Sequence, residues 1–90
     1  MTNDFDISQY LDSKEMIAEY LSQVLEDGDM DELLIAIGHI AKAKGMSQVS
    51  KDTGLGRESL YKAFIKGSNP KFDTVLKVLN SLDIKLKAVA

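Results

Sequence analysis

The sequence predicts an all-α fold of five helices followed by a short C-terminal β-strand, all within one 90-residue domain. Three observations predict it. Apolar residues recur at helical spacing through most of the chain, and glycines with capping residues divide it into five segments. Between Ile84 and Ala88, apolar residues alternate with lysines, a pattern typical of a strand. Because a chain this short buries only about 60 to 65% of its unfolded surface, we expect a dimer interface or another partner to supplement the core.

The composition is that of an ordinary soluble globular protein, with 44% hydrophobic and 28% charged residues. There is no cysteine, so neither a disulfide framework nor a thiolate metal site is expected. The chain has no run of eighteen apolar residues and no basic segment followed by a short apolar one. We therefore expect a cytoplasmic protein without membrane contact.

The net charge of −3 conceals two halves of opposite sign. Residues 1–32 hold ten acidic residues and a single lysine, whereas residues 33–90 hold ten basic and four acidic residues. A basic half suits a polyanion and an acidic half suits a basic partner, although an acidic helix can also be a simple solvated face. We divide the domain accordingly into an acidic arm and first helix (1–28), a core (29–82) and the strand (83–90).

The first two helices each follow a capping box. Residues 1–11 have no helical period and are expected to form an arm. Asp12 to Glu15 is the first box, with the Asp12 carboxylate as cap, and an apolar stripe from Met16 to Leu25 follows until Gly28. Asp29 to Glu32 is the second box, and it starts a helix that Gly45 ends.

Three shorter helices are predicted after Gly45. Ser47 is expected to cap the first of them, which runs to about Thr53. The next runs from Arg57 to about Lys66. For the last, Asn69-Pro70 is a start signal, with Asn69 as cap and Pro70 at the first helical position, and the helix carries apolar residues from Phe72 to Leu82.

The segment Gly54-Leu55-Gly56 has the spacing of a helix-turn-helix, in which two short helices cross steeply across a glycine-containing turn. The small Ser50 lies four residues before Gly54, where the two helices must approach. Gly54 is expected to take the turn conformation, while Leu55 and Leu60 point into the core. A hairpin of two helices packed only for stability would show a similar pattern.

The exposed side of the second helix indicates a nucleic-acid interface. In such motifs this helix enters the major groove and its N-terminal residues meet base edges. Arg57 suits a bidentate contact to guanine, and the lysines suit phosphates. Glu58 has three possible roles: it accepts from cytosine, pairs with Lys62 or orients Arg57. The candidate DNA-binding residues are Lys51, Arg57, Glu58, Ser59, Tyr61, Lys62, Lys66, Ser68 and Asn69.

Other chemistry finds no support in the sequence. His39 is the sole histidine and has no partner at metal-ligand spacing, which favours a packed or surface histidine. No phosphate loop, nucleophile elbow or dinucleotide fingerprint is present. We therefore expect no enzyme, no cofactor and no metal site.

Three segments together resemble a known family: YLDSKEMIAEYLSQVLEDGD, IAKAKGMSQVSKDTGLGRESLYKAF and NPKFDTVLKVLNSLDIKL. The chain resembles the probable addiction module antidote proteins, HigA-like antitoxins with an Xre-type, phage-repressor-like helix-turn-helix. Two residues depart from the pattern. Gly56 stands where Ser or Thr usually caps the recognition helix, and Ser50 replaces the usual alanine, so that a hydroxyl in the helix seam needs a partner.

The resemblance implies a lambda-repressor-like domain that binds palindromic operator DNA as a homodimer, represses its own operon and neutralises a small basic, RNA-cleaving toxin. The toxin contact is expected on the acidic residues Glu15, Glu19, Glu26 and Asp27. Two alternatives remain at this stage. The chain could be a stand-alone phage or prophage-type repressor, or a helix-turn-helix module that binds protein rather than DNA.

Overall fold

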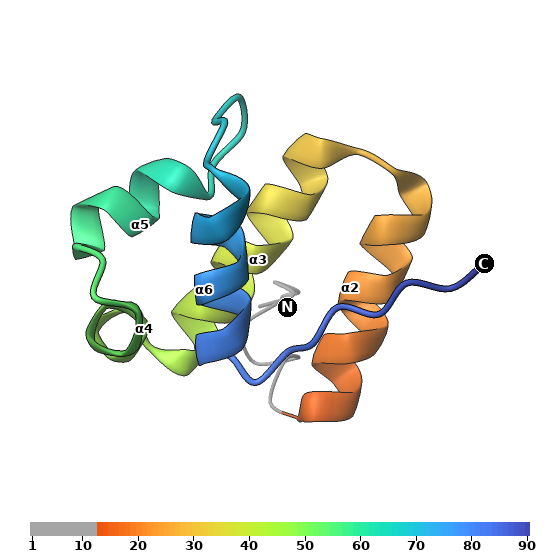
Figure 1. The fold of residues 1–90 in the computed structure, drawn as a ribbon, viewed down its shortest axis with the longest axis horizontal. Helices are drawn as coiled ribbons and strands as arrows, with labels where there is room; N and C mark the ends of the chain where they lie inside the picture. Colours follow the sequence, from red (N-terminus) through yellow and green to blue (C-terminus); the bar gives the residue numbers. More distant parts are fainter. Residues whose placement is uncertain (1–12) are drawn as a thin grey trace, which may run out of the picture.

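The computed structural model describes residues 13–90 and contains five α-helices over that range. Their bounds are α2 (Lys14–Asp27), α3 (Met30–Lys44), α4 (Met46–Thr53), α5 (Arg57–Ala63) and α6 (Phe72–Ser81). Figure 1 shows α2 and α3 as an antiparallel pair, with α4 and α5 on the far side of α3 and α6 in front of α3. The all-helical prediction is thus confirmed for the described residues.

The first two helices begin and end largely as their sequences predict. The Asp29 carboxylate accepts the Glu32 amide at 3.2 Å and caps α3. Gly28 ends α2 with a left-handed φ of 76°, which a residue with a β-carbon adopts only at a cost. The cap of α2, however, is Ser13, whose hydroxyl accepts the Met16 amide at 3.1 Å. The prediction of Asp12 as cap was therefore one residue early, and Asp12 itself lies outside the described residues.

One apolar core joins all five helices. Its most deeply buried large side chains come from four helices: Ile37 and Ile40 of α3, Val49 of α4, Leu60 of α5 and Val78 of α6. Helix α3 is central, since six of its fifteen residues are buried and every other helix lies around it. The Lys44 ammonium donates to the Ser81 carbonyl, linking the ends of α3 and α6.

Three helix ends differ from the prediction. Helix α4 starts at Met46 with Gly45 as its N-cap and without a side-chain cap, so Ser47 does not cap it. Helix α5 ends at Ala63, which places Lys66 in the turn that follows. Helix α6 starts at Phe72 with Lys71 as N-cap, because Asn69 and Pro70 belong to the preceding loop.

The predicted C-terminal strand is wrong for the described chain. Residues 84–90 carry no strand assignment, and no strand occurs between residues 13 and 90. A strand needs a second strand for its ladder, and the alternating pattern has another explanation here. The Ile84 amide donates to the Leu79 carbonyl at 3.0 Å and Ile84 packs on the core, so the segment is held by the end of α6.

Three residues expected in apolar stripes are exposed instead. Met16 and Leu25 of α2 and Phe72 of α6 lie at the surface, although neighbours in the same stripes, such as Val24 and Leu79, are buried. Helical periodicity selects a side of each helix, but it does not say how far the covering layer extends. None of the described helices is long and apolar enough to cross a membrane.

Candidate nucleic-acid interface

Helices α4 and α5 are joined by a three-residue turn whose backbone follows the prediction. Gly54 has a φ of 77°, in the left-handed region, and its amide donates to the Ser50 carbonyl at 2.9 Å. An added β-carbon at Gly54 would meet no atom within 4 Å, so the requirement for glycine comes from backbone conformation rather than from space. The turn therefore depends on the left-handed conformation of Gly54.

The hydroxyl of Ser50 has a partner in this turn. Its Oγ donates to the Leu55 carbonyl at 2.5 Å, and both residues are half-buried. Thr53 adds two bonds: its hydroxyl donates to the Val49 carbonyl at 2.8 Å and accepts the Leu55 amide at 3.2 Å. The Ser50 hydroxyl thus ties α4 to the turn that leads into α5.

Helix α5 is anchored from one side only. Leu60 is 1% exposed and Phe64 is 5% exposed, so these two side chains hold the helix against the core. At Gly38 on α3, an added β-carbon would lie 3.0 Å from the Phe64 carbonyl oxygen, which shows how closely α3 approaches the end of α5. Helix α5 is only seven residues long, and this close contact fixes its position.

The opposite side of α5 is polar and exposed. Gly56 provides its N-cap with extended backbone and without a side-chain hydrogen bond. Of the nine residues that the sequence singled out, Ser68 is half-buried and the other eight are exposed, namely Lys51, Arg57, Glu58, Ser59, Tyr61, Lys62, Lys66 and Asn69. The structure places five of them on α5, one on α4 and three in the loop that follows α5.

Sequence reasoning did not connect Lys42 with this surface. The Lys42 ammonium lies 5.9 Å from the centroid of the Tyr61 ring, within reach of a cation–π contact. The two residues also line a cleft of about 260 Å³ between α3 and α5, together with His39 and Lys66. Lys42 and Tyr61 lie 19 positions apart in the sequence, and no local pattern pairs them.

His39 lies at the edge of the same cleft and is half-buried. Its Nδ1 is 3.4 Å from the Tyr20 hydroxyl of α2. Burial, and then the positive charge of Lys42, lowers the pKa of His39. Burial, and then the Glu32 carboxylate, raises the pKa of Tyr20. Both groups are therefore neutral near pH 7, which suits a packed contact between α2 and α3. Among the described residues no group of three or more His, Asp or Glu side chains could hold a metal ion.

The acidic residues lie on another part of the molecule. Glu15, Glu19, Glu26 and Asp27 are all exposed on α2, which Figure 1 shows on the opposite side of α3 from α5. At 100° per residue, Glu15, Glu19 and Glu26 form one stripe along the helix, and Asp27 lies about 100° around from Glu26. The structure therefore separates the predicted toxin contact from the predicted DNA contact.

The described chain is thus an all-helical protein in which a short, one-sidedly anchored helix presents a polar, basic surface. A family model described as "Probable addiction module antidote protein" matches residues 1–90, and the chain belongs to this family. A similar protein is an uncharacterized protein of Haemophilus influenzae (strain Rd), 42% identical over 84 residues, which span 93% of this chain and 87% of that protein. No solved structure matches the chain significantly.

Proposed function

We propose that this protein is the DNA-binding antitoxin of a type II toxin–antitoxin module, which represses its own operon as a homodimer and neutralises a small basic, RNA-cleaving toxin. Membership of the antidote family supports the antitoxin role and a cognate toxin as partner. DNA binding rests on the geometry of α4, the turn and α5. The division into an acidic segment (1–28), a DNA-binding core (29–82) and a C-terminal segment (83–90) belongs to the same proposal.

The observation that carries DNA binding is the exposed polar side of α5, held by Leu60 and Phe64 on a fixed turn. Five DNA-facing candidates lie within seven consecutive residues, and Arg57 is the first of them. A helix anchored from one side can enter a major groove without rearranging the core. This arrangement is of the Xre, phage-repressor-like type, which is the finer assignment that we propose for the fold.

Within this site Arg57 reads a guanine, whereas the lysines contact phosphates. Ser59, Tyr61 and Asn69 donate to bases or phosphates, and the Lys42 ammonium lies 5.9 Å from the centroid of the Tyr61 ring. Lys66 lies beyond the end of α5, where it can reach a phosphate but not a base edge. The residues at the start of the helix therefore give specificity, and those at its end give affinity.

A gel-shift titration with the DNA upstream of the protein's own gene tests this division. Arg57→Ala should cost about 1 to 3 kcal/mol of binding and relax the preference at one base. Lys66→Ala should weaken all sequences alike and reduce the salt slope by about one. Lys77→Ala on α6 is the matched control, because Lys77 is exposed but lies outside the candidate surface. If all three variants bind the DNA with the wild-type affinity, α5 does not contact DNA.

The toxin contact is proposed on the α2 acids. A toxin that cleaves RNA must hold a polyanion, so its binding surface is basic, and a negative helix steers its encounter with the antitoxin. Replacing Glu15, Glu19, Glu26 and Asp27 by their amides should weaken toxin binding and reduce its salt dependence. Unchanged affinity with an unchanged salt dependence would place the toxin elsewhere.

A second candidate is a stand-alone phage or prophage-type repressor, which would use the same α5 surface. A short basic reading frame directly beside this gene favours the antitoxin, and its absence favours the lone repressor. If neither upstream DNA nor control DNA is bound, the remaining reading is a module that binds protein through the same helices.

A further inference from the structure

An apolar groove opens on the face formed by α2, α6 and the C-terminal segment. It has a volume of about 210 Å³, and buried core residues such as Leu79 form its floor. None of the described residues that line it is charged, and four at its rim have large exposed fractions: Phe72 67%, Met30 65%, Leu25 48% and Leu86 48%. An exposed apolar surface to which separate parts of a chain contribute marks an interaction site.

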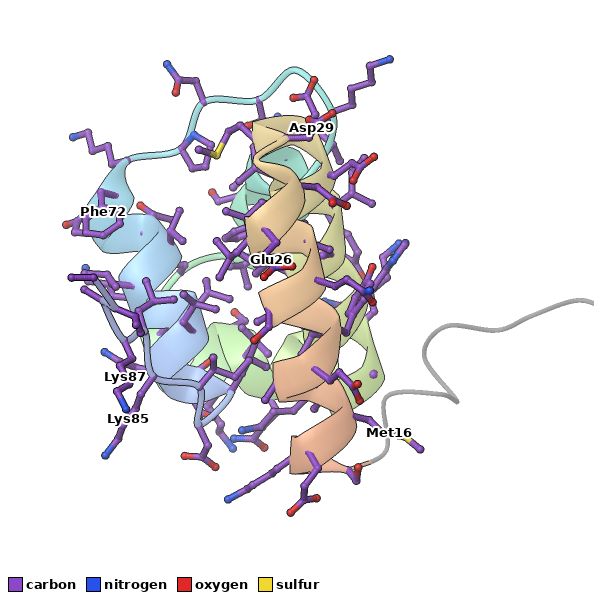
Figure 2. All side chains as sticks on the ribbon, turned by 90° about the vertical axis from the view of Figure 1, so that its right-hand side faces the viewer. Met16, Glu26, Asp29, Phe72, Lys85 and Lys87 are labelled. Atoms are coloured by element: carbon purple, nitrogen blue, oxygen red, sulfur yellow. The ribbon has the colours of Figure 1, made fainter. Side chains whose placement is uncertain are left out.

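The charges beside the groove have one sign only along the C-terminal segment. At the start of α6, Lys71 and Asp73 are both exposed, so that end of the groove is of mixed charge. At the other end, Lys85 and Lys87 are exposed, and residues 84–90 hold no acidic residue. Figure 2 shows both lysines near the C-terminal end of α6. A ligand that carries apolar and acidic side chains therefore suits this side of the groove.

The N-terminal arm (residues 1–12) joins the described structure beside the C-terminal segment. Helix α2 begins at Lys14, directly after the Ser13 cap that follows the arm. Lys14 lines one pocket together with Ile84 and Lys85. The start of α2 and the start of the C-terminal segment are therefore neighbours, and the arm begins next to the basic side of the groove.

The side of α2 that leads from this point into the groove is apolar. At 100° per residue, Ala18, Leu21 and Leu25 all lie within about 40° of Lys14 around the helix. Leu21 and Leu25 line the groove, and Ala18 is exposed between them and Lys14. The acidic stripe of α2 lies about 100 to 140° around the helix from Lys14. A path without acidic side chains therefore runs along α2 from the arm to the groove.

The arm has the composition that this surface suits. It holds no basic residue, and acidic and apolar residues alternate from Asp4 through Phe5 and Asp6 to Ile7. In an extended chain alternate side chains point to opposite sides, so the two apolar residues would share one side and the two aspartates the other. The chain from Ser13 back to Phe5 can span up to about 26 Å, more than the roughly 15 Å length of α6.

We propose that the N-terminal arm covers the groove of its own chain. Phe5 and Ile7 pack beside Leu86, and the two aspartates of the arm face the two lysines of the C-terminal segment. A short tether gives the arm an effective concentration on the order of millimolar, so even weak contacts keep it in place. A basic partner would instead meet those lysines with like charge. The contact adds apolar burial to a small core and requires neither DNA nor toxin.

A single tryptophan tests the proposal in the full chain, which has no tryptophan of its own. Phe5→Trp should fluoresce at a shorter wavelength than the same chain unfolded in urea, and dilution should not change this blue shift. In the reporter chain, Leu86→Asp places a charge in the groove and should remove the shift. Val89→Asp is the matched control, because Val89 is an exposed apolar residue of the same segment that does not line the groove, and the shift should remain.

Ile7→Trp is a second reporter on the same side of the arm, for the case that a tryptophan does not fit at position 5. Emission at the unfolded wavelength from both reporters would overturn the proposal. A blue shift that disappears on dilution would overturn it as well, and would assign the groove to a second copy of the chain. Circular dichroism of each variant checks that the helices are intact. None of these measurements involves DNA or toxin, so the outcome is separate from that of the proposed function.

A charge exchange within one chain tests how the arm is placed. Asp4→Lys with Asp6→Lys in the reporter chain brings lysines next to lysines and should reduce the blue shift. Adding Lys85→Glu and Lys87→Glu to that chain should restore the shift, because opposite charges then face one another again. A fourfold variant that stays as red-shifted as the twofold one would show that the arm does not lie along the C-terminal segment.

Discussion

Ser50 and Ser47 lie three positions apart on α4 and have different surroundings. Ser50 donates its hydroxyl to the Leu55 carbonyl at 2.5 Å, whereas Ser47 is exposed and caps nothing. The sequence indicated that a hydroxyl at position 50 would need a partner, but it could not say which carbonyl supplies it. The turn after Gly54 brings that carbonyl back toward α4, which only the folded chain shows.

The two serines make a matched pair for measurement. We expect Ser50→Ala to lower the free energy of unfolding by about 0.5 to 1.5 kcal/mol, because the half-buried Leu55 carbonyl loses its donor. Ser47→Ala should change it by less than about 0.5 kcal/mol. Urea denaturation of both variants measures the difference. A larger loss at Ser47 than at Ser50 would restore Ser47 as the helix cap and contradict the structure.

His39 makes stability depend on pH. Its pKa is lowered in the folded protein, while in the unfolded chain it is about 6.5, so the unfolded state binds more protons as the pH falls through that value. The free energy of unfolding should therefore decrease between pH 7.5 and pH 5.5. His39→Gln, which keeps a group able to bond with Tyr20, should show a smaller decrease in urea midpoint. A variant with the same pH dependence as the wild type would exclude His39 as the cause.

Among the elements, the helices themselves were predictable and several of their ends were not. Periodicity, the Asp29 cap and the glycines Gly28 and Gly54 are local features, and the structure agrees with them. Ser47 and Asn69 are good capping residues that the structure does not use as caps. Capping residues are equally suited to loops and turns, so a good capping residue does not by itself fix where a helix begins.

Helix α5 lacks a side-chain cap at its N-terminus, so a substitution that adds such a cap should stabilise the protein. Gly56 has a φ of −68°, open to any residue, and an added β-carbon would have the Ser59 Oγ as its nearest neighbour at 3.9 Å. Gly56→Ser should therefore raise the free energy of unfolding by a few tenths of a kcal/mol. Gly54→Ala should lower it by roughly 1 kcal/mol, because φ there is 77°. Urea midpoints of the two variants that shift in the same direction would contradict this account of the turn.

For the whole molecule, the sequence indicated two halves of opposite charge, and the structure keeps the exposed α2 acids apart from the exposed α5 surface. The sequence did not indicate which apolar residues would be exposed. Leu25 and Phe72 fit their helical stripes as well as buried residues do, and their exposure follows from how α2, α3 and α6 are placed around one another. The Lys42 and Tyr61 contact was missed for the same reason.

The close approach of α3 and α5 at Gly38 is a second property of the assembled fold. Alanine has a higher helix propensity than glycine by about 1 kcal/mol, but its β-carbon would lie 3.0 Å from the Phe64 carbonyl oxygen. Because that oxygen belongs to the backbone at the end of α5, it can move only with the helix, and overpacking costs about 1 to 3 kcal/mol. Gly38→Ala should therefore give a net loss of about 1 kcal/mol by urea denaturation. A net gain would mean that the two helices have room to separate.

The Asp31 carboxylate accepts a hydrogen bond from the Gly67 amide at 2.9 Å. This bond joins the acidic part of the chain (residues 1–32) to its basic part (residues 33–90). Asp31 opens α3 beside the acidic helix, while Gly67 follows the surface proposed for DNA. If toxin binding moves the start of α3, the loop after α5 moves with it. Toxin binding then changes the affinity for DNA, and DNA binding changes the affinity for the toxin. Thermodynamic reciprocity then requires equal factors in both directions, and Asp31→Ala should bring both factors toward one in paired titrations.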